Sequence, residues 1–454
     1  MKIVINGTGY VGLTTGSALA YLGHEVTCVD IDEKKIEDLK NGVMPIYEPG
    51  LEELIRVANS HLQFSTNAAD AIQEADVVFI AVGTPPMPDG KPNLNAVCAA
   101  ATTVGENLRS EFTVVVNKST VPIGCASWVE SIIREAYEDS HEGSSKGRFA
   151  VTSNPEFLRE GSAIFDILYP DRVVVGSNDA RATEMMYTLY RPILEQRFPA
   201  PTFLPRPDSL SAVPLIATDI SSAELIKYAS NAFLSTKISF INEISELAEK
   251  VGADVTQIAK GIGLDSRIGP RFLQAGLGWG GSCFGKDSSA LVATAREYGL
   301  RMPIVEAARE VNYRQRERIV EKLQNELKII KGKTIGILGL AFKANTDDLR
   351  DAPALDLAQS LVERGNWVRC HDPVALKRAR EETPDSGLYY FDDVEHMCQN
   401  VDALVLCTEW PQFRDMPWKK IAKTVQNPLF IDGRNFLDAD KMRKAGFNYV
   451  GMGR

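Results

Sequence analysis

The sequence contains few of the residues that bind metals or form disulfide frameworks. Its seven cysteines are odd in number, scattered along the chain and never spaced as Cys-x-x-Cys. Its five histidines never form a His-x-x-x-His pair. We therefore expect neither a disulfide scaffold nor a metal site, and any chemistry must come from other residues.

Positive charge and long apolar runs are also scarce. The formal net charge is -10, so an exposed surface for nucleic acid is not expected, because phosphate binding needs a basic field. No run approaches the roughly 20 apolar residues of a membrane span, and the first residues lack the features of a signal peptide. We expect a cytoplasmic protein without nucleic-acid or membrane partners.

The chain of 454 residues is longer than one hydrophobic core normally organises, and its composition is that of a globular protein. From Lys2 onward, short β-branched runs alternate with helical patterns. Such alternation predicts an α/β fold with a doubly wound parallel sheet, which we assign to a first domain at 1–200. The expected strands lie at 3–5, 26–29, 77–82, 114–116, 150–152 and 172–175, and the expected helices at 12–22 and 33–41.

A helical segment is predicted after the proline-rich stretch 199–207, which is read as a linker or surface loop. Ser221 to Glu224 match a capping box, which predicts a long, apolar connecting helix to about 252. Further helices are expected at 254–261, 287–298 and 303–329, giving an all-helical middle domain at 201–330. Strand and helix patterns return at 334–340, 353–364, 367–370, 403–407 and 429–432, which predicts a second Rossmann-like domain at 331–454.

Gly7, Gly9 and Gly12 form a G-x-G-x-x-G turn between the first strand and a helix. In that position the pattern lets a pyrophosphate approach backbone N–H groups at a helix N-terminus. Asp30 ends the second strand, where its carboxylate can bind an adenosine ribose, and Asp32 adds negative charge. The two carboxylates favour NAD over NADP. The position of Asp30 also favours a dinucleotide-binding turn over the alternative that the glycines serve only helix packing.

Cys283 directly precedes a helix that we expect to begin at Asp287. A thiol close to a helix N-terminus and to Lys286 should ionise readily, which suits covalent catalysis. Cysteine is also a common small buried residue, and Asp287 could be only a helix cap. The run itself leaves both readings open.

Two further groups of polar residues have a functional and a structural reading. Lys227 and Asn231 are four residues apart, on one face of the long helix, which could be a ligand-binding face or simply a solvated one. Glu156 and Glu160 lie in the loop 154–161 after a strand, at the sheet edge where open α/β folds bind ligands, and the run 118–122 ends another strand there. Each could instead be a capped turn.

Taken in order, these strings resemble the nucleotide-sugar dehydrogenases of the UDP-glucose/GDP-mannose dehydrogenase family. The resemblance covers nearly the whole chain and rests on GTGYVG at 7–12, VGTP at 82–85, STVP at 119–122, NPEFLREG at 154–161, the helix with Lys227 and Asn231, GGSCFGKD at 280–287, GLAFK at 339–343 and DGR at 432–434. It implies an NAD domain, a helical dimer core and a UDP-binding domain. It also implies a four-electron oxidation that consumes two NAD and one water, with UDP-glucose as the expected substrate and GDP-mannose as the alternative.

The resemblance implies a role for each matching residue. Cys283 would attack the C6 aldehyde to form a thiohemiacetal and then a thioester, while Lys227 and Asn231 would stabilise the oxyanion at C6. Asp287, Thr120 and Glu156 would position or activate water. The NAD site would comprise Gly7, Gly9, Tyr10, Val11, Gly12, Asp30, Lys35, Thr84, Thr120, Glu160, Lys286 and Arg350. The sugar-nucleotide site would comprise Glu156, Phe157, Leu158, Lys227, Asn231, Arg267, Phe272, Gly276, Phe342, Lys343 and Arg434.

In relatives the arginine that matches Arg267 reaches across a dimer, so a homodimer or higher homo-oligomer is implied. The chain departs from many relatives at Gly285, where proline is common, and at Trp279, where phenylalanine is common. Both residues flank Cys283 and concern the rigidity and width of the cysteine loop. The segment 202–217 is longer than usual, and the sequence gives it no role. Outside the family, the alternatives are a two-electron hydroxy-acid dehydrogenase without a thiol and a nucleotide-sensing scaffold.

Overall fold

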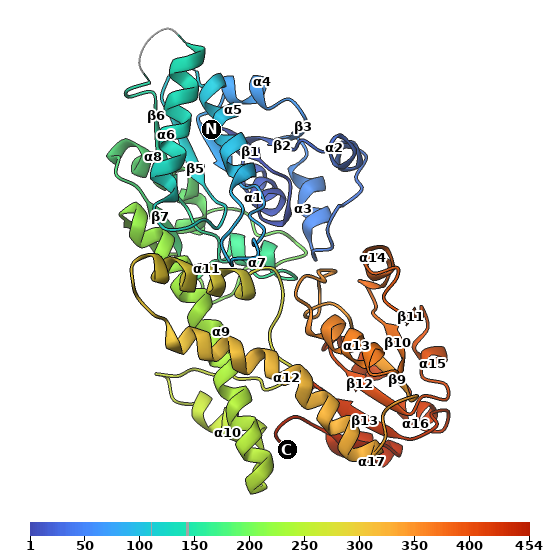
Figure 1. Ribbon diagram of the computed structural model, residues 1–454. Helices are drawn as coiled ribbons and strands as arrows, with labels where there is room; N and C mark the ends of the chain where they lie inside the picture. Colours follow the sequence, from blue (N-terminus) through green and yellow to red (C-terminus); the bar gives the residue numbers. More distant parts are fainter. Residues whose placement is uncertain (110, 142–144) are drawn as a thin grey trace. The chain divides into compact units, whose positions relative to one another are not determined.

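The computed structural model describes residues 1–109, 111–141 and 145–454 (Figure 1). The chain divides into two compact units, one of residues 1–229 and 289–294 and one of residues 230–288 and 295–454. The helical segment predicted at 201–330 is therefore shared between the units and forms no unit of its own. Each unit is built around one sheet and is described separately.

The first unit contains an eight-stranded sheet in the order β3-β2-β1-β4-β5-β6-β7-β8. Its first six strands follow the 3-2-1-4-5-6 order of dinucleotide-binding folds. The pairs are parallel except β6 with β7. The strands are β1 (Lys2–Asn6), β2 (Glu25–Val29), β3 (Leu62–Ser65), β4 (Val77–Ile80), β5 (Thr113–Asn117), β6 (Phe149–Ser153), β7 (Val173–Gly176) and β8 (Leu215–Thr218). The helices are α1 (Tyr10–Tyr21), α2 (Glu33–Lys40), α3 (Leu51–Ala58), α4 (Ala68–Gln73), α5 (Asn95–Asn107), α6 (Cys125–Ser140), α7 (Ala163–Leu168) and α8 (Ala180–Leu194).

The central strands of this sheet are buried on both faces, which explains their continuous apolar runs. Val77 and Phe79 of β4 pack into one apolar cluster, and Val78 and Ile80 pack into a second one. Side chains alternate between the faces of a strand, so the two clusters are the two covered faces of the sheet. The α/β fold predicted from the strand and helix alternation is confirmed.

Two strands that the sequence analysis did not predict lie at the edges of this sheet. β3 pairs only with β2, and β8 pairs only with β7. β8 lies within the segment 202–217 for which the sequence gave no role, and it extends the first sheet beyond residue 200. The predicted border at 200 thus falls inside the first unit.

The long helix is α9 (Ile220–Val251), as predicted, but it does not begin with the predicted capping box. Asp219 Oδ1 accepts a hydrogen bond from Ser222 N at 2.8 Å and caps the helix instead. The Glu224 carboxylate accepts from Gly124 N at 2.6 Å and Ala126 N at 3.1 Å. Glu224 therefore satisfies the free N–H groups at the start of α6, a partner distant in sequence that a local pattern does not reveal.

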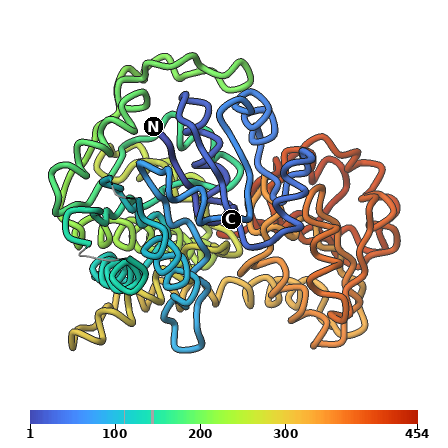
Figure 2. Tube along the Cα trace, turned by 90° about the horizontal axis from the view of Figure 1, so that it is seen from above, coloured from blue at the N-terminus to red at the C-terminus, as the bar shows by residue number. Residues whose placement is uncertain are grey.

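The second unit contains a parallel sheet in the order β11-β10-β9-β12-β13-β14, again the 3-2-1-4-5-6 order, so the predicted second Rossmann-like domain is confirmed. The residues of this sheet and of the helices around it, orange to red in Figure 2, gather into one compact group. The strands are β9 (Thr334–Leu338), β10 (Trp367–His371), β11 (Leu388–Tyr390), β12 (Ala403–Leu406), β13 (Leu429–Asp432) and β14 (Asn448–Val450). The helices are α13 (Pro353–Glu363), α14 (Leu376–Glu382), α15 (Val394–Met397), η1 (Pro411–Asp415), α16 (Trp418–Ile421) and α17 (Ala439–Ala445).

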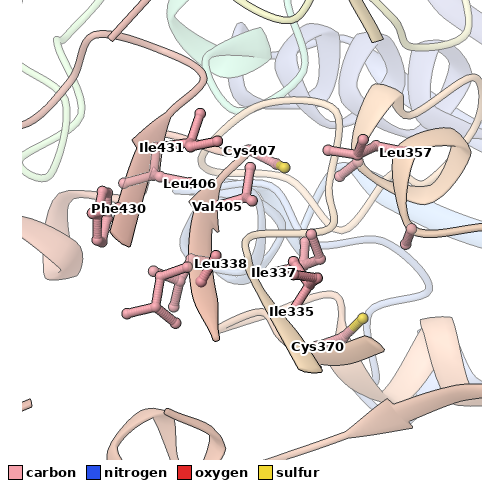
Figure 3. Packing of buried hydrophobic residues seen from close by; sticks show 14 of the residues in the cluster. Ile335, Ile337, Leu338, Leu357, Cys370, Val405, Leu406, Cys407, Phe430 and Ile431 are labelled. Atoms are coloured by element: carbon pink, nitrogen blue, oxygen red, sulfur yellow. The ribbon is translucent and has the colours of Figure 1, made fainter. Parts of the chain in front are cut away.

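The core of this unit lies around its central strands. Ile335 and Ile337 of β9 pack with Val405 of β12 and Ile431 of β13 (Figure 3). The helices before the sheet are α10 (Val255–Gly263), α11 (Phe284–Glu297) and α12 (Pro303–Leu327). Helices α9 and α11 each belong in part to both units.

Candidate active site

The glycine turn between β1 and α1 has the geometry of a phosphate-binding turn. Gly7 has φ of +104°, and a Cβ there would lie 2.7 Å from Ala81 O. A Cβ on Gly12 would lie 1.9 Å from Gly7 O, whereas a Cβ on Gly9 would meet no atom within 4 Å. Gly7 and Gly12 thus serve the close packing of strand and helix, and Gly9 leaves open space at the N-terminus of α1. The turn fits the pyrophosphate of NAD.

Asp30 follows β2 beside this turn. Its Oδ2 accepts from Thr8 N at 2.8 Å, Thr8 Oγ1 at 2.6 Å and Lys35 Nζ at 3.0 Å. Burial alone would raise the pKa of Asp30, but the hydrogen bonds from Thr8, Asp32 and Lys35 bring it below the usual value. Asp30 is therefore an anion beside the turn, as expected for a ribose-binding carboxylate. Asp32 accepts from Lys35 N and caps α2.

Other predicted NAD residues lie in loops of the same unit. Thr84 donates its hydroxyl to Thr120 O at 2.9 Å, so the loops after β4 and β5 are joined. The Tyr10 hydroxyl, at the start of α1, accepts from Gly161 N at 2.8 Å, next to Glu160 in the loop after β6. Val11 occupies the first turn of α1. The structure thus links the glycine turn, the residues 118–122 and the loop 154–161 at one sheet edge.

Glu156 and Lys227 form a buried ion pair, with Lys227 Nζ 2.7 Å from Glu156 Oε1. Glu156 Oε2 accepts from Leu158 N at 2.7 Å. Burial alone would raise the pKa of Glu156, but Lys227 and the Leu158 N–H hold it below the usual value. Phe157 stacks under the guanidinium of Arg172 at 3.7 Å. Lys227 is therefore not on a solvated helix face, and one open alternative is wrong.

Cys283 stands at the N-terminal end of α11, which begins at Phe284 and not at Asp287 as predicted. The helix begins earlier because the Asp287 backbone N–H already donates to Cys283 O at 2.8 Å. Cys283 is partly exposed, and Ser282 Oγ lies 3.5 Å from its Sγ. Cys283 is thus not one of the fully buried cysteines.

Asp287 lies in the first turn of α11 and is fully buried, with 0% exposure. Asn231 Nδ2 donates to its Oδ2 at 2.7 Å, and Lys286 Nζ lies 2.6 Å from its Oδ1. The alternative that Asp287 is only a helix N-cap is therefore wrong. It joins the α9 face to the cysteine run. In the structure Lys286 pairs with Asp287, whereas the resemblance assigns it to NAD.

The residues at the two departures from the family pattern are firmly held. The Trp279 indole is buried, donates to Ser239 Oγ at 3.1 Å and meets Phe284 edge-on. Arg309 donates to Gly285 O at 2.7 Å. A Cβ on Gly285 would lie 2.8 Å from Asp351 Oδ2, so the position has little free space. Neighbouring side chains therefore restrain the backbone at Gly285, where many relatives have the rigid ring of a proline.

Most of the predicted sugar-nucleotide residues of the second unit lie together. Arg434 donates to Gly278 O at 2.9 Å, Cys407 O at 2.8 Å and Phe342 O at 3.3 Å. Gly276 packs so closely on the chain before Arg434 that a Cβ would lie 2.6 Å from Gly433 O. Phe272 packs edge-on against Phe284, and Lys343 lies 5.3 Å from the Phe342 ring.

Two predicted binding residues have partners outside this group. Arg267 is exposed and pairs with Asp265 at 2.6 Å. Arg350 pairs through its guanidinium with Asp348 at 2.7 Å, while its carbonyl accepts from Gly281 N at 3.0 Å. Exposure of Arg267 is compatible with a partner on another copy.

Lys118 and Glu48 are not among the predicted site residues. Glu48 is buried and accepts from Gly161 N at 2.5 Å and Ala163 N at 2.7 Å, which fixes the end of the loop 154–161. Lys118 is buried with its ammonium 3.0 Å from Asn154 Oδ1. A single lysine at the end of a strand gives no signal of burial, so only the folded structure reveals it.

Among the described residues, no helix has the length and apolar character that crossing a bilayer would require. Over the same residues, no three or more histidine, cysteine, aspartate or glutamate side chains are grouped as metal ligands would be.

The chain is similar to known proteins over nearly its whole length. UDP-glucose 6-dehydrogenase TuaD of Bacillus subtilis (strain 168) is 45% identical over 457 residues, covering 100% of this chain and 93% of its own. UDP-glucose 6-dehydrogenase of Rhizobium meliloti (strain 1021) is 45% identical over 460 residues and is covered completely, as is this chain. A solved UDP-glucose dehydrogenase of Pyrobaculum islandicum superposes with a TM-score of 0.87 at 38% identity, over 99% of this chain and 97% of its own.

Three models of one family match successive parts of the sequence. Residues 1–194 match its NAD binding domain, residues 221–314 its central domain and residues 336–439 its UDP binding domain. Together with the glycine turn, the buried carboxylates and the cysteine at the start of α11, these matches show that the chain belongs to the UDP-glucose/GDP-mannose dehydrogenase family.

Proposed function

We propose that this protein is a UDP-glucose 6-dehydrogenase that converts UDP-glucose, two NAD and one water into UDP-glucuronate, two NADH and three protons. The observation that carries the proposal is the arrangement at the start of α11. There a partly exposed cysteine, Cys283, is followed one turn later by the buried carboxylate of Asp287, which contacts both an amide and an ammonium. Both curated relatives above carry UDP-glucose in their names, which favours this substrate over GDP-mannose.

The oxidation uses side chains on two helices. Bound NAD supplies the hydride acceptor for each of the two oxidations. Lys227 and Asn231 lie one turn apart on α9, so an ammonium and an amide can donate to the oxygen that becomes negative at C6. The Cys283 thiolate adds to the C6 aldehyde to give a thiohemiacetal, and oxidation of that adduct leaves a thioester.

Hydrolysis of the thioester then requires an oriented water. Water adds to the thioester carbonyl, the C–S bond breaks, and the thiolate of Cys283 leaves as the carboxylate forms. We assign the water to Glu156, Thr120 and Asp287, because Glu156 and Asp287 are fixed carboxylates and can accept its protons in hydrogen bonds. No histidine is needed for these steps.

The proposed binding sites follow the matched residues. Gly7, Gly9, Tyr10, Val11 and Gly12 would hold the pyrophosphate side of NAD. The other proposed NAD residues are Asp30, Lys35, Thr84, Thr120, Glu160, Lys286 and Arg350. Glu156, Phe157, Leu158, Lys227, Asn231, Phe272, Gly276, Phe342, Lys343 and Arg434 would hold the UDP-sugar, with Arg267 supplied by a second copy.

The α9 helix supports the proposed homodimer. Phe233, Phe240 and Leu247 recur every seven residues, and their exposed fractions are 67%, 49% and 59%. This spacing places them on one helix face, where a second copy of α9 could cover them. A cytoplasmic location is also proposed, because the seven cysteines are all free, as is usual in a reducing compartment.

The test is the yield of NADH from limiting UDP-glucose, with excess NAD and with the product identified by mass spectrometry. We expect two NADH per UDP-glucose and UDP-glucuronate as product. A yield of one NADH, or full activity of Cys283→Ser, would refute the four-electron mechanism. Initial rates with GDP-mannose serve as the substrate control, and faster turnover of GDP-mannose would overturn the choice of substrate.

A further inference from the structure

Lys118 is a buried cation to which the proposed mechanism gives no role. It follows β5 directly and is only 7% exposed. Its Nζ donates to Asn154 Oδ1 at 3.0 Å, in the loop after β6 that also carries Glu156. Lys118 therefore contacts the same loop as Lys227, which pairs with Glu156 at 2.7 Å.

The acceptor of Lys118 is itself fixed. Asn154 Oδ1 also accepts from the Tyr190 hydroxyl at 2.6 Å, and Asn154 Nδ2 donates to Val174 O at 2.7 Å. The amide therefore cannot turn without breaking buried hydrogen bonds. Lys118 is held at one place relative to the loop that carries Glu156.

A charged Lys118 is costly at this site, because its acceptor is a neutral amide. Burial lowers the pKa of Lys118 to about 8, with Glu156 opposing the shift and Lys227 adding to it. The charged groups that face it are thus Glu156 and Lys227, while the nearby Tyr190 phenol is neutral because burial raises its pKa. Methionine would fill a similar volume without this cost, so the lysine calls for a functional explanation.

We infer that Lys118 is a positioning residue for Glu156: its ammonium keeps the Glu156 carboxylate ionised and aligned with Lys227 for hydrolysis of the thioester. The inference rests on the proposed function. Lys227 pairs directly with the buried carboxylate, and Lys118 is held on Asn154, two residues before it in the same loop. Both ammonium groups lower the pKa of Glu156, Lys227 more than Lys118. An ionised Glu156 accepts a hydrogen bond from the attacking water, whereas a protonated one would donate instead.

The test compares Lys118→Met with Lys118→Arg, which keeps the charge, and with Tyr190→Phe, which disturbs Asn154 but removes no charge. In Lys118→Met the pKa of Glu156 should rise, so the acidic limb of the kcat profile should move to higher pH. The thioester on Cys283 should accumulate in acid-quenched enzyme, while KM for NAD stays unchanged. Lys118→Arg should restore most of the profile, and Tyr190→Phe should leave the limb in place.

A second readout is independent of the substrate. Infrared titration of the ligand-free enzyme reports the carboxyl band of Glu156, identified by its loss in Glu156→Gln. In Lys118→Met this band should titrate at higher pH than in the wild type. If the band and the acidic limb both stay in place, the inference is wrong. If the band moves but the wild type does not oxidise UDP-glucose, the proposed function fails while the control of Glu156 by Lys118 stands. Should Lys118→Met not fold, Lys118→Gln allows the same comparison.

Discussion

Two glycine-to-alanine substitutions in the glycine turn should separate effects on stability from effects on NAD binding. Gly9 has φ of -71°, which alanine adopts without strain, and its Cβ would enter open space. Gly9→Ala should therefore fold at least as well as the wild type, with a gain of up to about 0.5 kcal/mol from the less flexible unfolded chain. The same methyl would occupy the place that the NAD pyrophosphate needs, so NAD affinity should fall at least about tenfold, or about 1.4 kcal/mol.

Gly12→Ala is the matched contrast, because the added methyl would lie 1.9 Å from Gly7 O. That overlap forces the turn and α1 apart and should cost about 1–3 kcal/mol of stability together with NAD binding. Thermal melts without ligand and calorimetric titration with NAD measure both effects in both variants. If Gly9→Ala binds NAD as tightly as the wild type, the pyrophosphate does not lie at Gly9. If Gly12→Ala melts like the wild type, the close contact with Gly7 does not constrain the fold.

Four other predictions concern separate parts of the chain. Cys283→Ala should abolish UDP-glucuronate formation but leave the calorimetric affinity for NAD within about twofold, because the glycine turn lies on another element; a large loss of affinity would count against the assignment. Asp30→Asn should narrow the preference for NAD over NADP by about tenfold in kcat/KM, since the carboxylate no longer repels a 2′-phosphate; an unchanged ratio would contradict this role. Phe240→Glu places a charge on the exposed α9 face and should shift the sedimenting species towards monomer. An unchanged sedimentation profile would show that this face is not the dimer contact. Burial raises the pKa of Asp351 to about 6, so its carboxyl is more basic in the folded than in the unfolded chain and its contribution to stability falls as pH rises from about 4 to 6. In melting curves, the stability of Asp351→Asn relative to that of the wild type should therefore increase by about 2 kcal/mol between these pH values. A difference in stability that does not change with pH would refute this.

The sequence was sufficient for the fold where apolar periodicity was strong. The buried strands β4 and β5 are continuous apolar runs, and the long helix α9 was predicted to within one residue at each end. β3 and β8 were missed because edge strands are short and only partly buried, so their composition is mixed. The capping box failed for another reason: Glu224 caps α6, and a local pattern cannot name a partner 98 residues away.

The candidate site was predicted less completely than the fold. Motif order identified Cys283, Glu156 and Asp287, but the alternatives for Asp287 were separated only by its burial and its contact with Asn231. Burial of Lys118 depends on the packing of β5 against the loop after β6, and no spacing in the sequence encodes it. Pair choices such as Lys286 with Asp287 likewise depend on side-chain geometry.

The ion pairs of Glu156 and Asp287 explain why the proposed site needs no histidine. In the first unit Glu156 is held by Lys227 and has a pKa below the usual range. In the second unit Asp287 lies against the ammonium of Lys286. A carboxylate that an ammonium holds ionised is a weak base, so Glu156 is better suited to orient a water and a cation than to store a proton. The three protons of the proposed reaction must then reach solvent. A weak base at Glu156 is sufficient, because the thioester on Cys283 is already activated for attack by water.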